Sequence, residues 1–272
     1  MPVDPDKALG ALLGLAIGES LGGDPMVSTQ MAFRLADSLI AQGGFDPDDV
    51  LRSYVAWYGT GPTGVDATTA AVLQQVSAGA DAYRATSTHA VTAGGTLALT
   101  RSTPIAIAFA RHPEGLRDAT IADAALTDFD PLSGKAALVH NQSVGLLVAQ
   151  GPKALSNSLQ DPLPFDDRLQ DGILPAIGGV TRVAEQMAVA EPRNAVTPIA
   201  VAFAAYFTTT TFEEGLSWAV NIGGDSAANG ALAGALLGAR YGAAQVPRAW
   251  VDQLEARAQI DRLGAGLVAL AG

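Results

Sequence analysis

The sequence contains no cysteine among its 272 residues. Disulfide bonds, thiolate zinc sites and cysteine nucleophiles are therefore excluded, and the cytoplasm is the compartment we expect. Aromatic residues are also scarce, at 6% of the chain, whereas glycine is abundant, with 30 residues. Because β-sandwiches usually depend on aromatic and β-branched residues, this composition favours closely packed helices.

Basic residues are outnumbered, with 16 Lys and Arg against 27 Asp and Glu, and the formal net charge is −11. Binding to nucleic acid needs clustered cations, so no nucleic-acid partner is expected. Long apolar runs are missing too. The run at residues 8–18 is too short to span a bilayer, and it follows Asp4 and Asp6 rather than a positive cluster. We therefore expect no membrane partner and interpret this run as a buried first helix.

Signals for helix starts recur along the chain. Asp46-Pro47 and Asp130-Pro131 each combine a capping side chain with proline at the first helical position, and Thr211 precedes two acids. Val246-Pro247 predicts the start of the last helix. Apolar residues make up 49% of the sequence, which is enough for a sizeable core.

Strand signals are poor. Residues 180–183 are too few to assign as a strand, and residues 208–211 are better interpreted as a turn with a cap. Residues 84–102 and 151–178 are the least regular parts and are predicted to be rich in loops. The prediction is one all-α domain over residues 1–272, folded as a single compact multi-helix orthogonal bundle.

The most informative motif is a glycine turn followed by a helix of small residues. Gly223-Gly224 delivers Asp225 to a helix start, where an Asp is first of all an N-cap. Each glycine inside the helix costs about 1 kcal/mol relative to alanine, so their number predicts very close approach of a neighbouring helix. The small residues concerned are Gly230, Ala231, Gly234, Ala235 and Gly238.

This segment resembles the C-terminal signature of ADP-ribosylglycohydrolases, which reads Gly-Gly-Asp-x-Asp-Thr, an Ala/Gly-rich helix, Tyr-Gly, and then Pro and Trp. The stretch from Gly18 to Gly22 likewise resembles the end of the family's opening helix, which usually reads Gly-Asp-Ala-Leu-Gly. Further similar stretches follow in family order at residues 29–39, 45–61, 101–104 and 127–131. The resemblance covers nearly the whole chain and implies an all-α bundle of the ADP-ribosylglycohydrolase type.

The resemblance also implies two magnesium ions, held by a Thr-Asp-Asp motif and by Asp-x-Asp-Thr. Here the first motif reads Met26-Val27-Ser28, and the second reads Asp225-Ser226-Ala227-Ala228. Of the six ligand positions, only Asp225 keeps a carboxylate, and Ser28 offers at most a hydroxyl. One carboxylate cannot hold two magnesium ions, and apolar replacements disfavour a cation further. We expect a degenerate, metal-independent site without a cofactor.

Three carboxylates remain as candidate catalytic residues, namely Glu19, Asp24 and Asp225. Carboxylates that converge in a half-apolar cleft can act as general acid and base. The alternative is structural, with Asp225 as a cap, Asp24 in a turn and Glu19 solvated. The candidate substrate-binding residues lie beside these motifs and are Ser28, Thr29, Gly94, Gly95, Thr96, Ser226 and Asn229.

Three functions are consistent with the sequence. The chain is a hydrolase-like enzyme with a metal-free cleft, acting on an N-glycosidic or other small-molecule substrate; or a non-catalytic relative that binds a ligand or partner; or a structural protein, as crystallin relatives of the family are. A well-formed pocket favours the first two, and a cleft filled by side chains favours the third. The oligomeric state is left open by the sequence.

Overall fold

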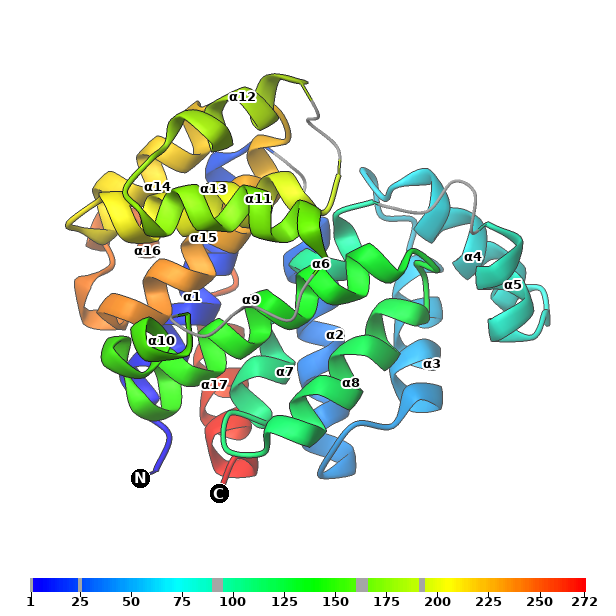
Figure 1. Cartoon of the computed structure of the whole chain (residues 1–272). Coiled ribbons are helices and arrows are strands. Elements are labelled where there is room, and N and C mark those ends of the chain that lie inside the picture. Colours follow the sequence, from blue (N-terminus) through cyan, green and yellow to red (C-terminus); the bar gives the residue numbers. More distant parts are fainter. Residues whose placement is uncertain (1, 24–25, 90–94, 160–165, 191–193) are drawn as a thin grey trace.

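The computed structural model describes residues 2–23, 26–89, 95–159, 166–190 and 194–272, and within them it contains helices and no strand. This confirms the all-α prediction (Figure 1). The first half contains α1 Pro5–Leu21, α2 Val27–Gln42, α3 Pro47–Tyr58, α4 Ala67–Ser77, α5 Ala82–Thr88, α6 Leu97–Thr100, α7 Thr103–Ala108, α8 Pro113–Ala125 and α9 Pro131–Gln150. The second half contains α10 Pro152–Ser158, α11 Asp167–Ile177, α12 Arg182–Ala190, α13 Val196–Thr208, α14 Phe212–Asn221, α15 Ser226–Tyr241, the short 3-10 helix η2 Ala243–Gln245, α16 Arg248–Val251 and α17 Arg257–Leu270.

The predicted helix starts are confirmed by their caps. The side chains of Asp46, Asp130 and Thr211 accept backbone N–H groups in the first turns of α3, α9 and α14. The prediction at Val246-Pro247 was wrong, because α16 is only one turn long and α17 follows it. Helix α17 carries a buried face formed by Ile260, Leu263 and Leu267, and this face packs against α1 and α2.

The two segments predicted to be rich in loops also contain helices. Helix α5 begins before residue 84 and continues into that range, and α6 lies at its end. Residues 151–178 contain α10 and α11, and α11 buries Leu169 and Ile173 on one face. These helices are short, so their periodic signal in the sequence is weak compared with that of α9 or α15.

Two helices from opposite ends of the chain form the centre of the molecule. Glycines of α1 face glycines of α15, so a Cβ placed at Gly14 would lie only 1.9 Å from the carbonyl oxygen of Gly234. The same close approach joins Gly10 to Gly238 and Gly18 to Gly230, at 2.4 Å and 1.9 Å. This order makes the two helices antiparallel, and it confirms the close packing predicted from the small residues of α15.

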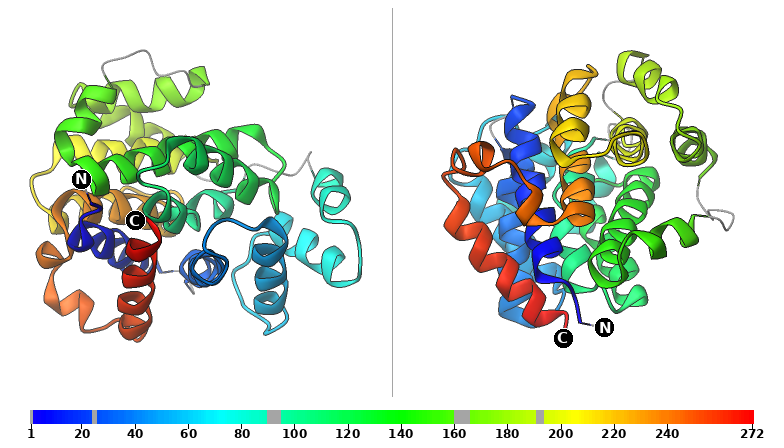
Figure 2. Two further views of the ribbon diagram at one scale, coloured as in Figure 1. Left: turned by 90° about the horizontal axis from the view of Figure 1, so that it is seen from below. Right: turned by 90° about the vertical axis from the view of Figure 1, so that its left-hand side faces the viewer.

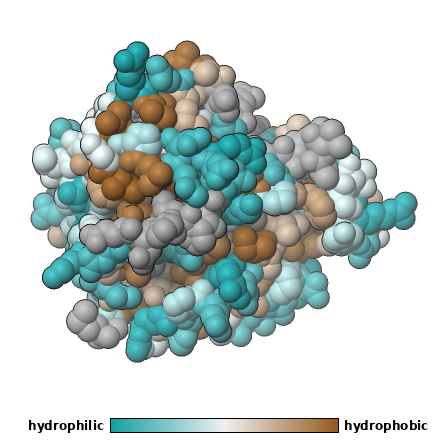
Figure 3. All heavy atoms as spheres, viewed as in Figure 1, coloured by the Kyte–Doolittle hydropathy of each residue, from teal (hydrophilic) through white to brown (hydrophobic). Residues whose placement is uncertain are grey.

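The other helices surround this central pair. Helices α13 and α14 pack on α15, whereas α17 packs on α1, and α9 contacts both central helices. Figures 1 and 2 show α4 and α5 at one side of the molecule and both chain ends at another. Hydrophilic side chains cover much of the face in Figure 3, interrupted by apolar patches. Among the described residues, no helix combines the length and apolar character needed to cross a membrane.

Candidate functional site

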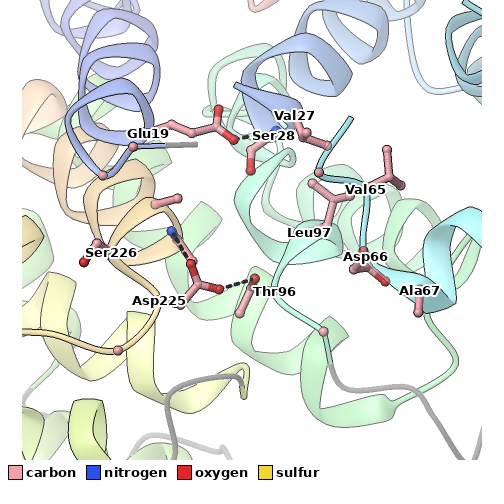
Figure 4. A pocket seen from close by; sticks show the side chains of 17 residues that line it. Glu19, Val27, Ser28, Val65, Asp66, Ala67, Thr96, Leu97, Asp225 and Ser226 are labelled. Atoms are coloured by element: carbon pink, nitrogen blue, oxygen red, sulfur yellow. Dashed lines mark hydrogen bonds between the residues drawn. The ribbon is translucent and has the colours of Figure 1, made fainter. Parts of the chain in front are cut away.

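A cavity of about 570 Å³ lies where the C-terminal end of α1 meets the beginnings of α2, α4, α6 and α15. Figure 4 shows Glu19, Asp225 and Ser226 on one side of the cavity, and Val65, Asp66 and Leu97 on the other. The lining residues are Glu19, Gly22, Gly23, Val27, Ser28, Gly64, Val65, Asp66, Ala67, Gly95, Thr96, Leu97, Gly224, Asp225, Ser226, Ala227 and Ala228. The cleft is therefore open rather than filled by side chains.

Glu19 stands at the end of α1 and is 1% exposed, which contradicts the solvated alternative. Its Oε1 accepts the backbone N–H of Ser28 at 2.7 Å, and its Oε2 accepts the N–H and hydroxyl of Thr29 at 2.8 and 2.7 Å. Burial raises the pKa of Glu19 above its ordinary value, although the hydrogen bonds from Thr29 and Ser28 lower it. Both oxygens are thus engaged in capping α2 from outside that helix.

Asp225 is the N-cap of α15, as the structural interpretation of the sequence predicted. Its Oδ1 accepts the backbone N–H of Ala228 at 3.1 Å, and its Oδ2 accepts the hydroxyl of Thr96 at 3.2 Å. The turn before it needs glycine, because Gly223 and Gly224 have φ values of +99° and +74°. A side chain at Gly224 would also lie 2.5 Å from the carbonyl oxygen of Ala188. This turn sets the side chain of Asp225 against the cavity.

A third carboxylate lines the cavity and was not predicted from the sequence. Asp66 caps α4, because its Oδ1 accepts the backbone N–H of Thr69 at 2.9 Å. Its Oδ2 is buried and has no hydrogen-bond partner among the described residues. A Cβ at Gly95 would lie 3.6 Å from this carboxyl group, so position 95 borders it directly. A buried carboxylate oxygen without a donor is costly unless a ligand or water supplies one.

Behind the cavity wall lies a buried ion pair. Arg101 is fully buried; its Nε donates to the carboxylate of Asp123 at 3.0 Å, and its Nη1 donates to the hydroxyl of Thr127 at 2.6 Å. The hydroxyl of Tyr54 donates to the other Asp123 oxygen at 2.8 Å. The charge of Arg101 also interacts with Asp66, and the nearby anions, Asp123 first, raise the pKa of Arg101 despite its burial. Arg101 itself does not line the cavity.

The other predicted site residues that the structure describes form two groups. Ser28, Gly95, Thr96 and Ser226 line the cavity. Thr29 and Asn229 are buried and are not brought into its lining: the hydroxyl of Thr29 donates to Glu19, and the side-chain amide of Asn229 donates to the carbonyl of Gly223 at 3.0 Å. Two further predicted residues, Asp24 and Gly94, lie outside the described residues.

The donor set of this cavity does not fit a pair of magnesium ions. At the positions of the missing ligands, Val27, Ala227 and Ala228 present apolar groups to the cavity. The hydroxyl of Ser28 is hydrogen-bonded to that of Thr100 at 2.8 Å. Nowhere in the described part of the chain do three or more His, Cys, Asp or Glu side chains group together in a way that could hold a metal ion. Hard divalent cations need several oxygen ligands, mostly carboxylates.

The sequence profile of the ADP-ribosylglycohydrolase family matches residues 1–272. The chain belongs to the ADP-ribosylglycohydrolase family. It is 28% identical to the ADP-ribosyl-dinitrogen reductase glycohydrolase of Rhodospirillum rubrum, over 98% of this chain and 97% of the relative. It is 25% identical to the ADP-ribosylarginine hydrolase Tri1 of Serratia proteamaculans (strain 568), over 98% and 80% of the two chains.

A solved structure confirms the fold of this family member. An ADP-ribosylglycohydrolase-related protein complex contains a chain that superposes with a TM-score of 0.82 at 27% identity, covering 98% of this chain and 99% of that one. The likeness spans 98% of the chain, so the helical architecture that includes the central helix pair is shared with that structure. The side chains that line the cleft are this chain's own, and its function has to be argued from them.

Proposed function

We propose that this family member is a hydrolase that cleaves an N-glycosidic or related small-molecule bond with carboxylates alone, independently of a magnesium pair. The observation that carries the proposal is Asp66. Asp66 lines a cavity of about 570 Å³ and has a buried carboxylate oxygen without a hydrogen-bond partner among the described residues, while apolar side chains replace the metal ligands there. A cavity of this size suits a small organic molecule.

The roles follow from the hydrogen bonds. Asp66 has a free acceptor site, so it is the group that can take the proton of an attacking water molecule. Asp225 is held by the N–H of Ala228 and the hydroxyl of Thr96, so its role is electrostatic: it stabilises positive charge developing at the anomeric carbon. Glu19 positions the first turn of α2, which carries Ser28.

The bond changes balance without an additional reactant. The water oxygen bonds to the anomeric carbon, the carbon–nitrogen bond breaks, and its electron pair leaves with the nitrogen. Asp66 accepts the water proton and returns it to solvent, and a base that leaves as an anion takes one proton from solvent in turn. Val27, Val65 and Leu97 supply apolar surface at the cavity, which reduces competing hydration of the reacting groups.

One observation favours binding without catalysis as a second candidate. Glu19 and Asp225 each cap a helix, and both oxygens of each residue already accept hydrogen bonds. These contacts would be needed even in a protein that only binds a ligand. The purely structural role fits less well, because the cleft is open rather than filled.

The test is turnover with and without metal. N-ribosides with and without a pyrophosphate group are incubated with the protein in EDTA or in magnesium chloride, and release of the free base is followed. We expect turnover in EDTA, reduced by about a hundredfold or more in the Asp66→Asn variant, because a positioned general base contributes at least that factor. Asp225→Asn should also lose most turnover. Asparagine keeps the helix cap in both variants.

Asp46→Asn is the matched control, since Asp46 caps α3 through the N–H of Asp49 and does not line the cavity. Its turnover should equal that of the unaltered protein. Turnover that appears only with magnesium, or an unchanged rate in Asp66→Asn, would overturn the proposal. Tight binding of an N-riboside with no turnover under either condition would establish the second candidate instead.

A further inference from the structure

We infer that the cleft selects a phosphate-free N-glycoside whose leaving group carries a positive charge. The inference rests on the proposed function, which it deepens by naming the substrate class. Four observations carry it: the charge of the cavity lining, the occupation of the helix N-termini there, the unpartnered oxygen of Asp66, and the supply of proton donors.

The ionisable side chains that line the cavity are all acids. Glu19, Asp66 and Asp225 contribute carboxylates, and the described lining contains no Lys, Arg or His. The guanidinium of Arg101 acts on Asp66 from behind the wall, but it is paired with Asp123 and does not reach the lining. A phosphate or pyrophosphate would therefore meet negative charge with no counter-ion, and like charges brought together in this way oppose binding.

Helix N-termini normally attract phosphate groups, and those of three helices longer than two turns, α2, α4 and α15, meet at this cavity, beside the single-turn helix α6. Each is already occupied by one of the chain's own carboxylates: Glu19 at α2, Asp66 at α4 and Asp225 at α15. Each helix offers only about half a positive charge against the full negative charge of an ionised carboxylate, so negative charge remains in excess at the cavity. The places that would hold a phosphate are taken, and the excess charge favours a cation.

The orphaned oxygen of Asp66 indicates the same class of ligand. Asp66 Oδ2 is buried and accepts no hydrogen bond among the described residues. A ligand that brings positive charge or N–H donors beside Gly95, whose Cβ position is 3.6 Å from the Asp66 carboxyl group, would satisfy it. This oxygen is an independent sign of a ligand, since helix capping needs only the other oxygen of the same group.

The need to protonate the leaving group also favours a substrate with a cationic base. A neutral base must gain a proton as it leaves the sugar, whereas a cationic base leaves as a neutral molecule when it takes the bonding electron pair. Glu19 is the carboxyl group in the cleft whose pKa is raised by burial, but both of its oxygens are held by Ser28 and Thr29. With Asp66 acting as base, the cleft has no further carboxyl group free to protonate a neutral leaving group.

The test compares four probes that differ in positive charge and in phosphate content. Nicotinamide riboside is cationic and phosphate-free; its dihydro form is neutral; nicotinamide mononucleotide adds one phosphate; ADP-ribose has the pyrophosphate and no cation. Binding is measured by calorimetry in EDTA, and hydrolysis by release of the free base of each probe. We expect nicotinamide riboside to bind about tenfold or more tightly than each of the other three. Asp66→Asn and Asp66→Ser, which both keep the cap, should abolish the preference over the neutral form.

The outcomes separate this inference from the proposed function. If the neutral riboside or either phosphate-bearing probe binds as tightly as nicotinamide riboside, or if no probe binds, the inference is overturned. If the inference is overturned but ADP-ribose compounds are hydrolysed in EDTA, the proposed function still holds. If nicotinamide riboside binds selectively but is not hydrolysed, the inference stands as a statement of ligand class, and the proposed catalysis fails. Asp46→Asn should retain the full preference in every case.

Discussion

Three acids at one cavity show how differently the same functional group can be used. Both oxygens of the buried Glu19 accept hydrogen bonds from α2. One oxygen of Asp225 accepts a hydrogen bond from α15 and the other accepts one from Thr96, whereas one oxygen of Asp66 accepts none from the described residues. The number of hydrogen bonds that each carboxylate accepts, more than its distance from the cavity, determines what chemistry it can offer. Asp66 therefore has the largest part in the proposed mechanism.

A buried histidine makes the stability of the protein depend on pH. His140 of α9 is fully buried, its Nε2 lies 3.2 Å from the carbonyl oxygen of Leu232, and burial lowers its pKa to about 4. Between pH 6.5 and about 4, the unfolded chain binds a proton at this residue and the folded chain does not. The free energy of unfolding should fall by up to about 3 kcal/mol across this range because of His140.

The measurement is the free energy of unfolding from urea titrations at pH 7 and pH 4.5. His140→Gln should be less stable than the unaltered protein at pH 7 and should lose less stability on acidification. His112→Gln is the control, because His112 is exposed and precedes α8 at the surface. The three proteins contain the same carboxylates, so an identical pH dependence in His140→Gln would contradict the assignment.

At the level of single residues, the sequence predicted the kind of contact that a side chain makes, such as a helix cap, better than the direction in which the side chain points. The cap formed by Asp225 could be predicted, because a glycine turn before a helix has few other uses. The sequence could not show that Thr29 lies outside the cavity lining. The rotation of α2 about its axis, which only the structure gives, turns Thr29 toward Glu19 and Ser28 toward the cavity. Asp66 had a readable signal, a capping Asp before a helix, but its neighbours in the cleft are set by tertiary packing.

The helical elements depend most on the contact between α1 and α15. Replacing Gly14 by alanine should destabilise the protein by about 2 kcal/mol or more, because the new methyl group would overlap the backbone of Gly234. The helix-forming preference of alanine offsets only about 1 kcal/mol of this strain. Thermal or urea unfolding of Gly14→Ala checks the prediction.

Gly264→Ala is the matched control. It also places alanine inside a helix, but its Cβ would make ordinary contacts with Leu9 and Leu12 at 3.5 and 3.6 Å. This variant should be neutral or more stable, by up to about 1 kcal/mol. Equal stability changes in the two variants would show that the close packing of α1 against α15 is not what limits stability.

Long helices with strong caps were predictable from sequence, and short ones were not. Helices α3, α9 and α14 begin where Asp46, Asp130 and Thr211 indicated. Helix α16, with four residues, and α17 were merged in the prediction, because a single turn has no period to detect. The close packing of α15 was predicted, whereas its partner, α1, could be identified only when both glycine rows were placed side by side.

At the scale of the whole molecule, the proposal of metal independence makes a thermodynamic prediction. Magnesium or manganese chloride at millimolar concentration should leave the melting temperature unchanged relative to EDTA, because Val27, Ala227 and Ala228 stand where oxygen ligands would be needed. A ligand that binds only the native state must raise the melting temperature with its concentration. A concentration-dependent rise, absent with an equal ionic strength of sodium chloride, would contradict the proposal.

The pairing of α1 with α15 also has a consequence for how the protein is made. Helix α1 is synthesised long before the glycine row of α15 that it must contact. Until then, α1 lacks its most extensive contact, although α2, α7 and α9 can already pack on it, and the two walls of the cleft cannot meet. Nascent chains released short of α15 should therefore be substrates for chaperones and proteases, because the contact between α1 and α15 has not yet formed in them.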